Sequence, residues 1–253
     1  MPKIISEITT TEKIITEYGY KKNGASRFVV VAPHAAGDDY RTGKIARKIA
    51  ENLNGFLIIN NKYFKASNSK AAERPEFVED FNKLYWSRKK EKHIWSRKKP
   101  AMQTFFFDIE KYCILARDYS PDHKAIIIYI HGMKFPDVAI DLGVGLKAKK
   151  NKLRFYSGAQ SLGSFSGAPT FPIGKLKELQ KLLEKAMLTR YNLGVSIGQY
   201  YAAWSKRIAV QFHKHNGRND MAIQIEINKE IRQKISDINF ITSIISQIFK
   251  NVF

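Results

Sequence analysis

The sequence predicts an α/β fold in which helices cover both faces of a central, parallel sheet. Short β-branched runs alternate with amphipathic segments, which is the pattern of parallel strands joined by crossover helices. Several of these runs are continuously apolar, as strands buried on both faces are. With 253 residues, of which 44% are hydrophobic and 12% aromatic, the chain can bury a large core, and we expect one domain spanning residues 1–253.

The first β-α-β unit lies near the N-terminus. Arg27–Ala32 (RFVVVA) is a β-branched run ended by a proline, which indicates a buried strand. In Thr42–Asn54, isoleucine and leucine recur every four residues, which predicts a helix with one apolar face. Gly55 ends this helix, and Phe56–Ile59 (FLII) is a second buried strand. The two strands should therefore be parallel.

The same alternation continues toward the C-terminus. The predicted elements are a helix at Thr104–Arg117, a strand at Ala125–Ile130, a helix at Gly174–Tyr191, a strand at Ala222–Asn228 and a helix at Ile238–Phe249.

Composition limits the chemistry and the partners. The chain has 43 Lys and Arg against 23 Asp and Glu, a net charge of +20, so its partner is expected to be anionic: nucleic acid, acidic lipid or a small carboxylate. Cys113 is the single cysteine, which excludes an internal disulfide and a thiolate zinc cluster. No segment has the pattern of a secretory signal or a membrane span, so we expect a cytoplasmic protein with no membrane partner.

Three stretches interrupt the α/β pattern. The basic insertion at about 85–100 contains WSRKK twice, at Trp86–Lys90 and Trp95–Lys99. It is either a basic arm whose aromatic rings stack on bases or, as we prefer, a solvated insertion with partly buried Trp rings. Lys147–Arg154 is a second basic run, expected to be a surface turn. Ser157–Pro169 is rich in Gly and Ser, which is typical of a flexible loop or lid.

Three segments partly match well-known motifs but lack residues that those motifs require. Gly37–Lys44 has five residues between its glycines and no Ser or Thr after the lysine, so it is not a Walker motif. Gly143-Val144-Gly145 lacks the third glycine and the helix start of a dinucleotide fingerprint. The serines of 157–169 do not form a Gly-x-Ser-x-Gly elbow, so no serine hydrolase nucleophile is visible.

Two histidines lie at the ends of predicted strands. His34 follows the first strand after one proline, and His131 directly follows the strand that ends at Ile130. In a parallel sheet both imidazoles would emerge at the carboxyl edge and could converge. Asp38 and Asp39 share the turn of His34, and two His with one carboxylate suit catalytic zinc. The alternative is an ordinary strand-end histidine capped by a turn aspartate.

The last predicted strand has one polar face. In Ile223–Asn228, isoleucines alternate with Gln, Glu and Asn, so alternate side chains point to opposite faces of the sheet. Polar side chains on a covered strand are expected where they line a cleft, which makes Glu226 a candidate general base. The alternative is an edge strand whose outer face is solvated.

Together these motifs resemble the N-formylglutamate amidohydrolase family, a branch of the zinc carboxypeptidase-like hydrolases related to phage-type poly-γ-glutamate hydrolases. The resemblance runs over roughly residues 27–235. It is carried by Pro33-His34 with its turn carboxylate, Thr42, His131-Gly132, Asp137–Gly143, Gln224–Asn228 and Arg232. It implies a three-layer α/β/α, carboxypeptidase-like fold with a mixed, largely parallel sheet.

The resemblance also implies roles for individual residues. His34 and His131 would be ligands of a Zn²⁺ cofactor. Asp39, five residues after the first His, would be the third ligand, with Asp38 as the alternative. Glu226 would be the general acid/base.

Substrate binding is implied for a further segment. Asp80-Phe81-Asn82-Lys83 resembles the family's Asp-x-Asn-Arg segment, so Asn82 and Lys83 are expected to hold a substrate carboxylate. Lys83 replaces Arg, which removes bidentate recognition, and Asp39 replaces a longer Glu. Further candidates for substrate contact are Arg41, Arg218, Arg232, His213 and His215.

The expected activity is zinc-dependent hydrolysis of an amide bond in a small anionic substrate, an N-acyl-amino acid or γ-glutamyl compound. One rival interpretation is a nucleic-acid-binding protein that uses the WSRKK pair and Lys147–Arg154. The other is a hydrolase fold whose site has degenerated, as the substitutions at Asp39 and Lys83 suggest.

Overall fold

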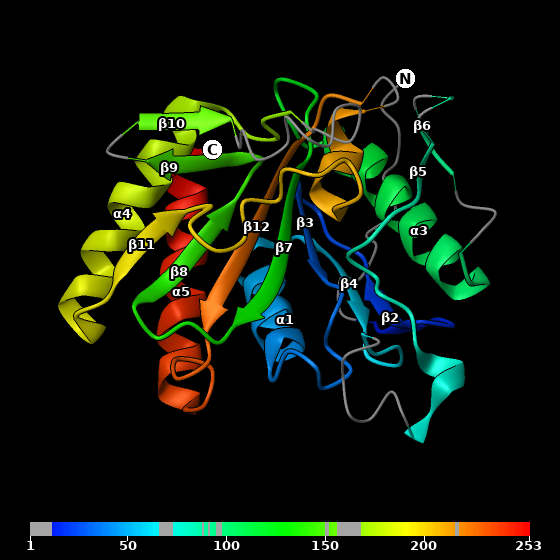
Figure 1. The fold of residues 1–253 in the computed structure, drawn as a ribbon, viewed down its shortest axis with the longest axis horizontal. Helices are drawn as coiled ribbons and strands as arrows, with labels where there is room; N and C mark the ends of the chain where they lie inside the picture. The colour runs from blue at the N-terminus through cyan, green and yellow to red at the C-terminus, as the bar shows by residue number, and fades with distance from the viewer. Residues whose placement is uncertain are drawn as a thin grey trace, which may run out of the picture.

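A computed structural model describes residues 12–65, 73–87, 89–90, 92–94, 98–149, 152–155, 168–215 and 218–253. Its central element is an eight-stranded sheet, drawn across the middle of Figure 1, with strand order β1-β2-β4-β3-β7-β12-β8-β11. The strands of this sheet are β1 (Ile14–Ile15), β2 (Gly19–Lys22), β3 (Phe28–Ala32), β4 (Phe56–Asn60), β7 (Ile126–Met133), β8 (Val138–Gly143), β11 (Gly194–Ile197) and β12 (Met221–Asn228).

The sheet is mixed, with a parallel centre. β4, β3, β7 and β12 run parallel to one another, while β8 is antiparallel to β12 and β2 is antiparallel to β4. β11 pairs with β8 in parallel. The expected arrangement, a mixed and largely parallel sheet, is confirmed.

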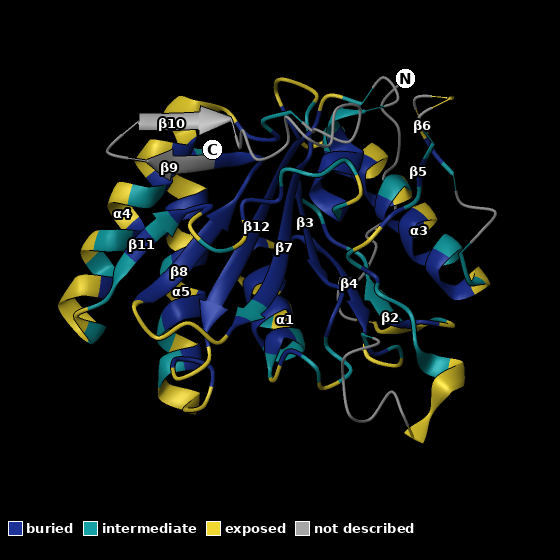
Figure 2. Ribbon diagram, in the orientation of Figure 1, coloured by how far each residue is buried: buried dark blue, intermediate teal, exposed yellow. Residues whose placement is uncertain are grey.

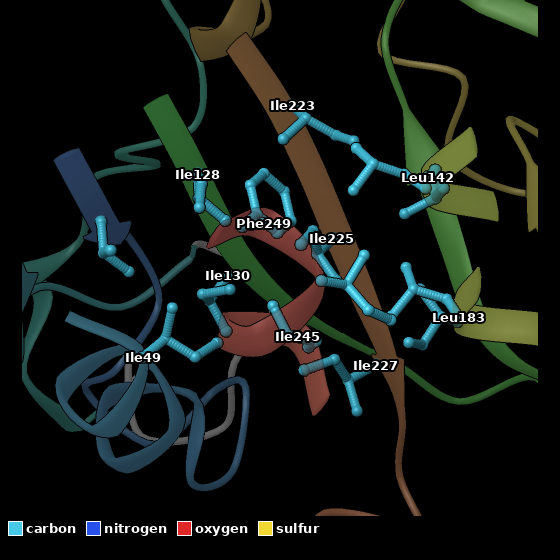
Figure 3. Packing of buried hydrophobic residues seen from close by; sticks show 14 of the residues in the cluster. Ile49, Ile128, Ile130, Leu142, Leu183, Ile223, Ile225, Ile227, Ile245 and Phe249 are labelled. Atoms are coloured by element: carbon cyan, nitrogen blue, oxygen red, sulfur yellow. The ribbon is translucent and has the colours of Figure 1, made fainter. Parts of the chain in front are cut away.

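One face of the sheet is covered by three helices, α1 (Thr42–Leu53), α4 (Ile173–Tyr191) and α5 (Ile235–Val252). Their apolar faces pack on alternate residues of the central strands, so that Ile223, Ile225 and Ile227 of β12 all point into this layer (Figure 3). The β-branched runs form strands because their side chains are buried on both faces, as the dark central strands of Figure 2 show.

The other face is covered by α3 (Pro100–Arg117) and the short 3-10 helix η4 (Ala209–Lys214). Phe105, Ile109 and Tyr112 of α3 pack on Val29 and Ile127 of the sheet. The molecule is thus the expected three-layer α/β/α structure. Within the described residues, no helix is long and apolar enough to span a membrane.

Small elements lie outside these layers: η1 (Pro75–Phe77), the hairpin of β5 (Trp86–Ser87) and β6 (Lys92–His93), and the hairpin of β9 (Leu146–Lys149) and β10 (Lys152–Phe155). In the basic insertion, the Trp86 ring is buried and packs edge-on against His93, as the interpretation with partly buried Trp rings expects for this copy of the motif, whereas Trp95 lies outside the described residues. The run Lys147–Arg154, expected to be a turn, instead lies mostly in strands β9 and β10. Of the expected lid at Ser157–Pro169, residues 157–167 lie outside the described residues.

Candidate active site

Two imidazoles meet at the carboxyl edge of the sheet. His34 lies just beyond the end of β3, and His131 lies near the end of the neighbouring parallel strand β7. Their ring centroids are 5.2 Å apart, and both side chains are 2% exposed. The sequence places His131 directly after its strand; in the structure β7 continues through it to Met133.

Carboxylates surround both rings. Asp38 Oδ2 lies 3.3 Å from His34 Nδ1, and Asp39 Oδ2 lies 3.5 Å from His131 Nδ1. On the other side of His34, Asp80 Oδ1 lies 3.5 Å from Nε2, a position from which a carboxylate orients an imidazole. The turn that follows β3 therefore supplies two acids to the site, and a separate loop supplies the third.

Glu226 joins the site from the next strand. It is the cross-strand partner of His131 in the parallel pairing of β12 with β7, so both side chains lie on the same face of the sheet. β12 is a central strand with β7 on one side and β8 on the other, so the edge-strand alternative is wrong. Burial raises the pKa of Glu226 to about 7, and the amide of Gln224 donates a hydrogen bond to its carboxylate.

These groups open onto one pocket of about 360 Å³, lined by both histidines, Asp80 and Glu226. Two lysines of its lining bring positive charge. Lys65 Nζ lies 3.0 Å from Asp39 Oδ1, and Lys83 Nζ lies 3.3 Å from Asp80 Oδ2. Asn82 also lines the pocket, so the structure brings both members of the predicted Asn82-Lys83 pair to the site.

The pKa shifts of His34 and Asp39 favour the binding of a cation at the site. Burial lowers the pKa of His34, which leaves the imidazole neutral with a lone pair available to a ligand. For Asp39, burial opposes ionisation, but hydrogen bonding with His131 and the charge of Lys65 hold its pKa well below the usual value. An ionised carboxylate next to a neutral imidazole is the protonation state in which these groups bind a metal.

Three buried atoms of the site make no hydrogen bond of good geometry within the described chain: His34 Nδ1, which has Asp38 Oδ2 at 3.3 Å, His131 Nε2 and Asp38 Oδ1. Buried polar atoms are nearly always satisfied, so unpaired ones on two imidazoles and a carboxylate call for an explanation. Nitrogen and carboxylate oxygen are the donors that zinc prefers. The donor types present therefore suit zinc, although within the described residues no three ligand atoms of the two histidines, Asp38 and Asp39 lie within 4.8 Å of one another, and Lys65 already supplies a positive charge to Asp39.

Other predicted cations lie elsewhere. The Arg232 guanidinium is buried beneath Gly132, where it donates hydrogen bonds to the carbonyl oxygens of Ile227, Tyr40 and Met133. It fixes the end of β7 and does not line the pocket.

Arg218 is also absent from the pocket lining. It pairs with Glu110 and lies over the ring of Phe212, 4.0 Å from its centroid. Arg41, which does not line the pocket either, donates a hydrogen bond to the carbonyl of Gln233.

Three possible ligands that do lie close together are found away from the pocket, under α3. One ligand atom from each of Cys113, His213 and Asp220 lies within 4.8 Å of the others, the one such group in the part of the chain that the structure describes. Asp220 already accepts two hydrogen bonds from Arg117, at 3.0 and 2.5 Å, and His213 Nε2 lies 2.9 Å from the Tyr129 hydroxyl. We interpret it as a buried hydrogen-bond network.

The two histidines of the 3-10 helix region are not brought to the pocket. Burial lowers the pKa of His213 to about 3 and that of His215 to about 4, and the His215 ring lies 5.1 Å from that of Trp86. Neither residue lines the pocket at the sheet edge.

Comparison with solved structures gives the same fold. The chain superposes on a structure described as zinc-free YndL with a TM-score of 0.50 and 14% identity, over 92% of this chain and 89% of that one. The fold is similar to that of YndL. This similarity agrees with the three-layer, carboxypeptidase-like fold class that the sequence motifs imply.

Two further similar structures bear functional names. N-formylglutamate amidohydrolase from Ralstonia eutropha JMP134 matches with a TM-score of 0.48 and 11% identity, over 95% of this chain and 96% of that one. A bacteriophage poly-gamma-glutamate hydrolase matches with a TM-score of 0.45 and 11% identity, over 91% and 86% of the two chains. At 11% identity, these two similarities concern the fold and not the activity. No family model matches the sequence, and no curated protein matches it.

Proposed function

We propose that the protein is a zinc-dependent amidohydrolase that cleaves an amide bond in a small anionic N-acyl-amino acid or γ-glutamyl compound. The observation that carries the proposal is the convergence of His34, His131 and Glu226 in one pocket, with Asp38 and Asp39 against the two imidazoles and an unpaired buried nitrogen on each ring. The fold similarity to zinc-free YndL and the family resemblance of the motifs agree with it.

His34, His131 and Asp39 would hold the metal, with Asp38 as the alternative carboxylate ligand. When bound, zinc supplies Lewis-acid chemistry that polarises a carbonyl group and lowers the pKa of water. Asp80 holds the imidazole of His34 from its other nitrogen, as second carboxylates commonly do for metal-ligating histidines.

Glu226 is proposed to move the proton. Water adds to the amide carbonyl carbon and loses a proton to the Glu226 carboxylate, which then passes this proton to the leaving nitrogen as the C–N bond breaks. The products are a carboxylic acid and an amine, so atoms and charge balance. A pKa of about 7, set by burial, suits a group that must accept and return a proton near neutral pH.

Lys65 and Lys83 are proposed to attract the anionic substrate. Lys83 is paired with Asp80 but its side chain is 65% exposed, so it can turn toward a substrate carboxylate as a point charge. Lys65 lies deeper, next to Asp39, where its charge also acts on Glu226. Asn82 lines the same wall of the pocket and can donate through its amide.

The activity is tested by measuring amine release from N-formyl-, N-acetyl- and N-succinyl-L-glutamate and γ-glutamyl-glutamate, with zinc-loaded protein. We expect turnover of at least one of them and a loss of at least about 100-fold in kcat for Glu226→Gln, the usual effect of removing a general base. The variant should keep its zinc because Glu226 is not a ligand. Equal activity of variant and wild type, or activity that survives removal of zinc, would refute the proposal.

A further inference from the structure

A buried carboxylate that this mechanism does not use lies beside Glu226. Asp141 of β8 is the antiparallel cross-strand partner of Glu226 and is fully buried. It accepts four hydrogen bonds: from Ser196 Oγ at 2.7 Å and from the backbone N–H groups of Gln199, Tyr200 and Tyr201 at 3.0, 2.9 and 2.8 Å. A buried carboxylate that accepts three consecutive backbone donors fixes the path of the chain through them.

The segment held in this way, residues 198–203, lies directly against β8 because glycines leave space for it. A Cβ atom on Gly143 would lie 2.4 Å from the carbonyl oxygen of Tyr201, and one on Gly198 would lie 2.0 Å from that of Leu146. The N–H of Gly145 donates to the carbonyl of Ala202 at 2.7 Å. The Gly143-Val144-Gly145 motif, which is no dinucleotide fingerprint, thus allows residues 198–203 to pack closely on β8. We call this segment the wall, because it forms one side of the pocket.

The wall presents two adjacent tyrosines to the pocket, and their hydroxyl groups differ. Tyr200 stacks on Phe135, with centroids 4.0 Å apart, and its hydroxyl donates to Asp137. Tyr201 lines the pocket with Glu226 and His131, is 37% exposed, and its hydroxyl has no hydrogen-bond partner within the described chain. Burial, followed by the negative charges of Glu226 and Asp39, raises the pKa of Tyr201.

We infer that Tyr201 is a substrate-contacting residue whose phenol donates a hydrogen bond to the oxygen of the scissile carbonyl as negative charge develops there, and that Asp141 is the residue that positions it. The inference rests on the proposed function. A phenol that stays protonated at neutral pH is a donor of this kind, and donors aimed at developing charge stabilise the transition state. The hydrogen bonds that Asp141 accepts hold the backbone of residues 199–201 in place before substrate binds, which lowers the cost of ordering this part of the pocket during the reaction.

The test compares two variants that each lose one hydroxyl. Tyr201→Phe should lower kcat/KM on the best acyl-glutamate substrate by about 10- to 100-fold, the range for a hydrogen bond to a charged group. Tyr191→Phe, at the end of α4 and away from the pocket lining, should leave it within about twofold, because it removes only a hydrogen bond to Asp237. Equal effects of the two variants would overturn the role of Tyr201, while the loss in Glu226→Gln would still support the hydrolase.

Asp141 is tested in combination. Asp141→Asn should lower kcat more than it raises KM, and in a Tyr201→Phe background it should cause little further loss, because both changes remove the same contact. Independent, multiplying losses would show that Asp141 serves stability alone. Thermal unfolding of each variant, measured alongside, separates damage to the fold from damage to the wall.

Binding provides a readout besides turnover. Acetohydroxamate, a small carbonyl ligand of zinc hydrolases, should bind zinc-loaded Tyr201→Phe at least 5-fold more weakly than wild type in isothermal titration, and Tyr191→Phe normally, since one hydrogen bond is worth about that factor. Unchanged binding in Tyr201→Phe overturns the inference. Failure of acetohydroxamate to bind zinc-loaded wild type would overturn the inference and the proposed function together.

Discussion

At the scale of single residues, the site depends on side chains that are costly to bury. Glu226 lies between the apolar core and the pocket, and burial raises its pKa to about 7. Its neighbours His131 and Gln224 favour the ionised form, and Asp39 opposes it. Such a balance is typical of groups that exchange protons in catalysis, whereas a structural carboxylate such as Asp141 is surrounded by donors.

The pKa of Glu226 has a consequence for stability. Between pH 4.5 and about 7 the folded protein keeps a proton on Glu226 that the unfolded chain has lost, so the free energy of unfolding falls as pH rises through this window. Gln cannot titrate, so zinc-free Glu226→Gln should gain roughly 1–3 kcal/mol relative to wild type between pH 5 and pH 8. Urea unfolding in EDTA at both pH values measures this. An equal pH dependence of the two proteins would contradict the raised pKa.

The sequence predicted the residues of the site that lie at strand ends. His34, His131 and Glu226 stand out because polarity interrupts apolar strands at the edge where parallel sheets bind ligands. Lys65 and Asp80 were not recognised as partners of Asp39 and His34 because they lie on loops, whose course depends on tertiary packing.

Arg218 is a residue that the sequence predicted for the site and that the structure places outside the pocket lining. Its charge favoured a role in substrate binding, but nothing in its local sequence reveals that Glu110 and Phe212 of the α3 face hold it away from the pocket.

At the scale of elements, β8 links the sheet to the wall of the pocket. It pairs with β12 on one side and β11 on the other, and its Asp141 and Gly143 hold the segment that carries Tyr201. The Val138–Gly143 run was recognised only through the family resemblance, because a six-residue antiparallel strand with an internal Asp lacks the continuous apolar pattern of its neighbours.

The longer elements were predicted because each has a strong periodic or apolar signal. The strand expected at Ala222–Asn228 and the helix at Thr42–Asn54 match β12 and α1 to within one residue. Short strands such as β1 and β5, of two residues each, contain too few positions to show any period.

Two glycines offer a matched test of the β8 wall. Gly143→Ala would place a methyl group 2.4 Å from the Tyr201 carbonyl, so we expect a loss of about 1–3 kcal/mol in stability and at least tenfold in kcat/KM. Gly174→Ala, in the first turn of α4, meets nothing within 4 Å and should be neutral or stabilise by up to about 1 kcal/mol. Equal activity and thermal stability in the two variants would contradict this, because it would show that the backbone at Tyr201 can move away from β8 without loss.

At the scale of the whole molecule, the charge and the fold have separate consequences. A net charge of +20 draws anions toward the surface, whatever their nature, and does not define the reaction. The fold brings residues 34, 131 and 226 together from three adjacent strands, and this convergence defines the chemistry. Zinc bound to the folded state should also stabilise the molecule by mass action.

The most direct test of this account is the zinc content of the purified protein after zinc loading and gel filtration, by elemental analysis. We predict about one zinc per chain in wild type. The His34→Ala/His131→Ala variant should hold none, and the control His123→Asn, a change at an exposed histidine, should hold as much as wild type. Wild type without zinc, or zinc retained after the loss of both site histidines, would contradict the account.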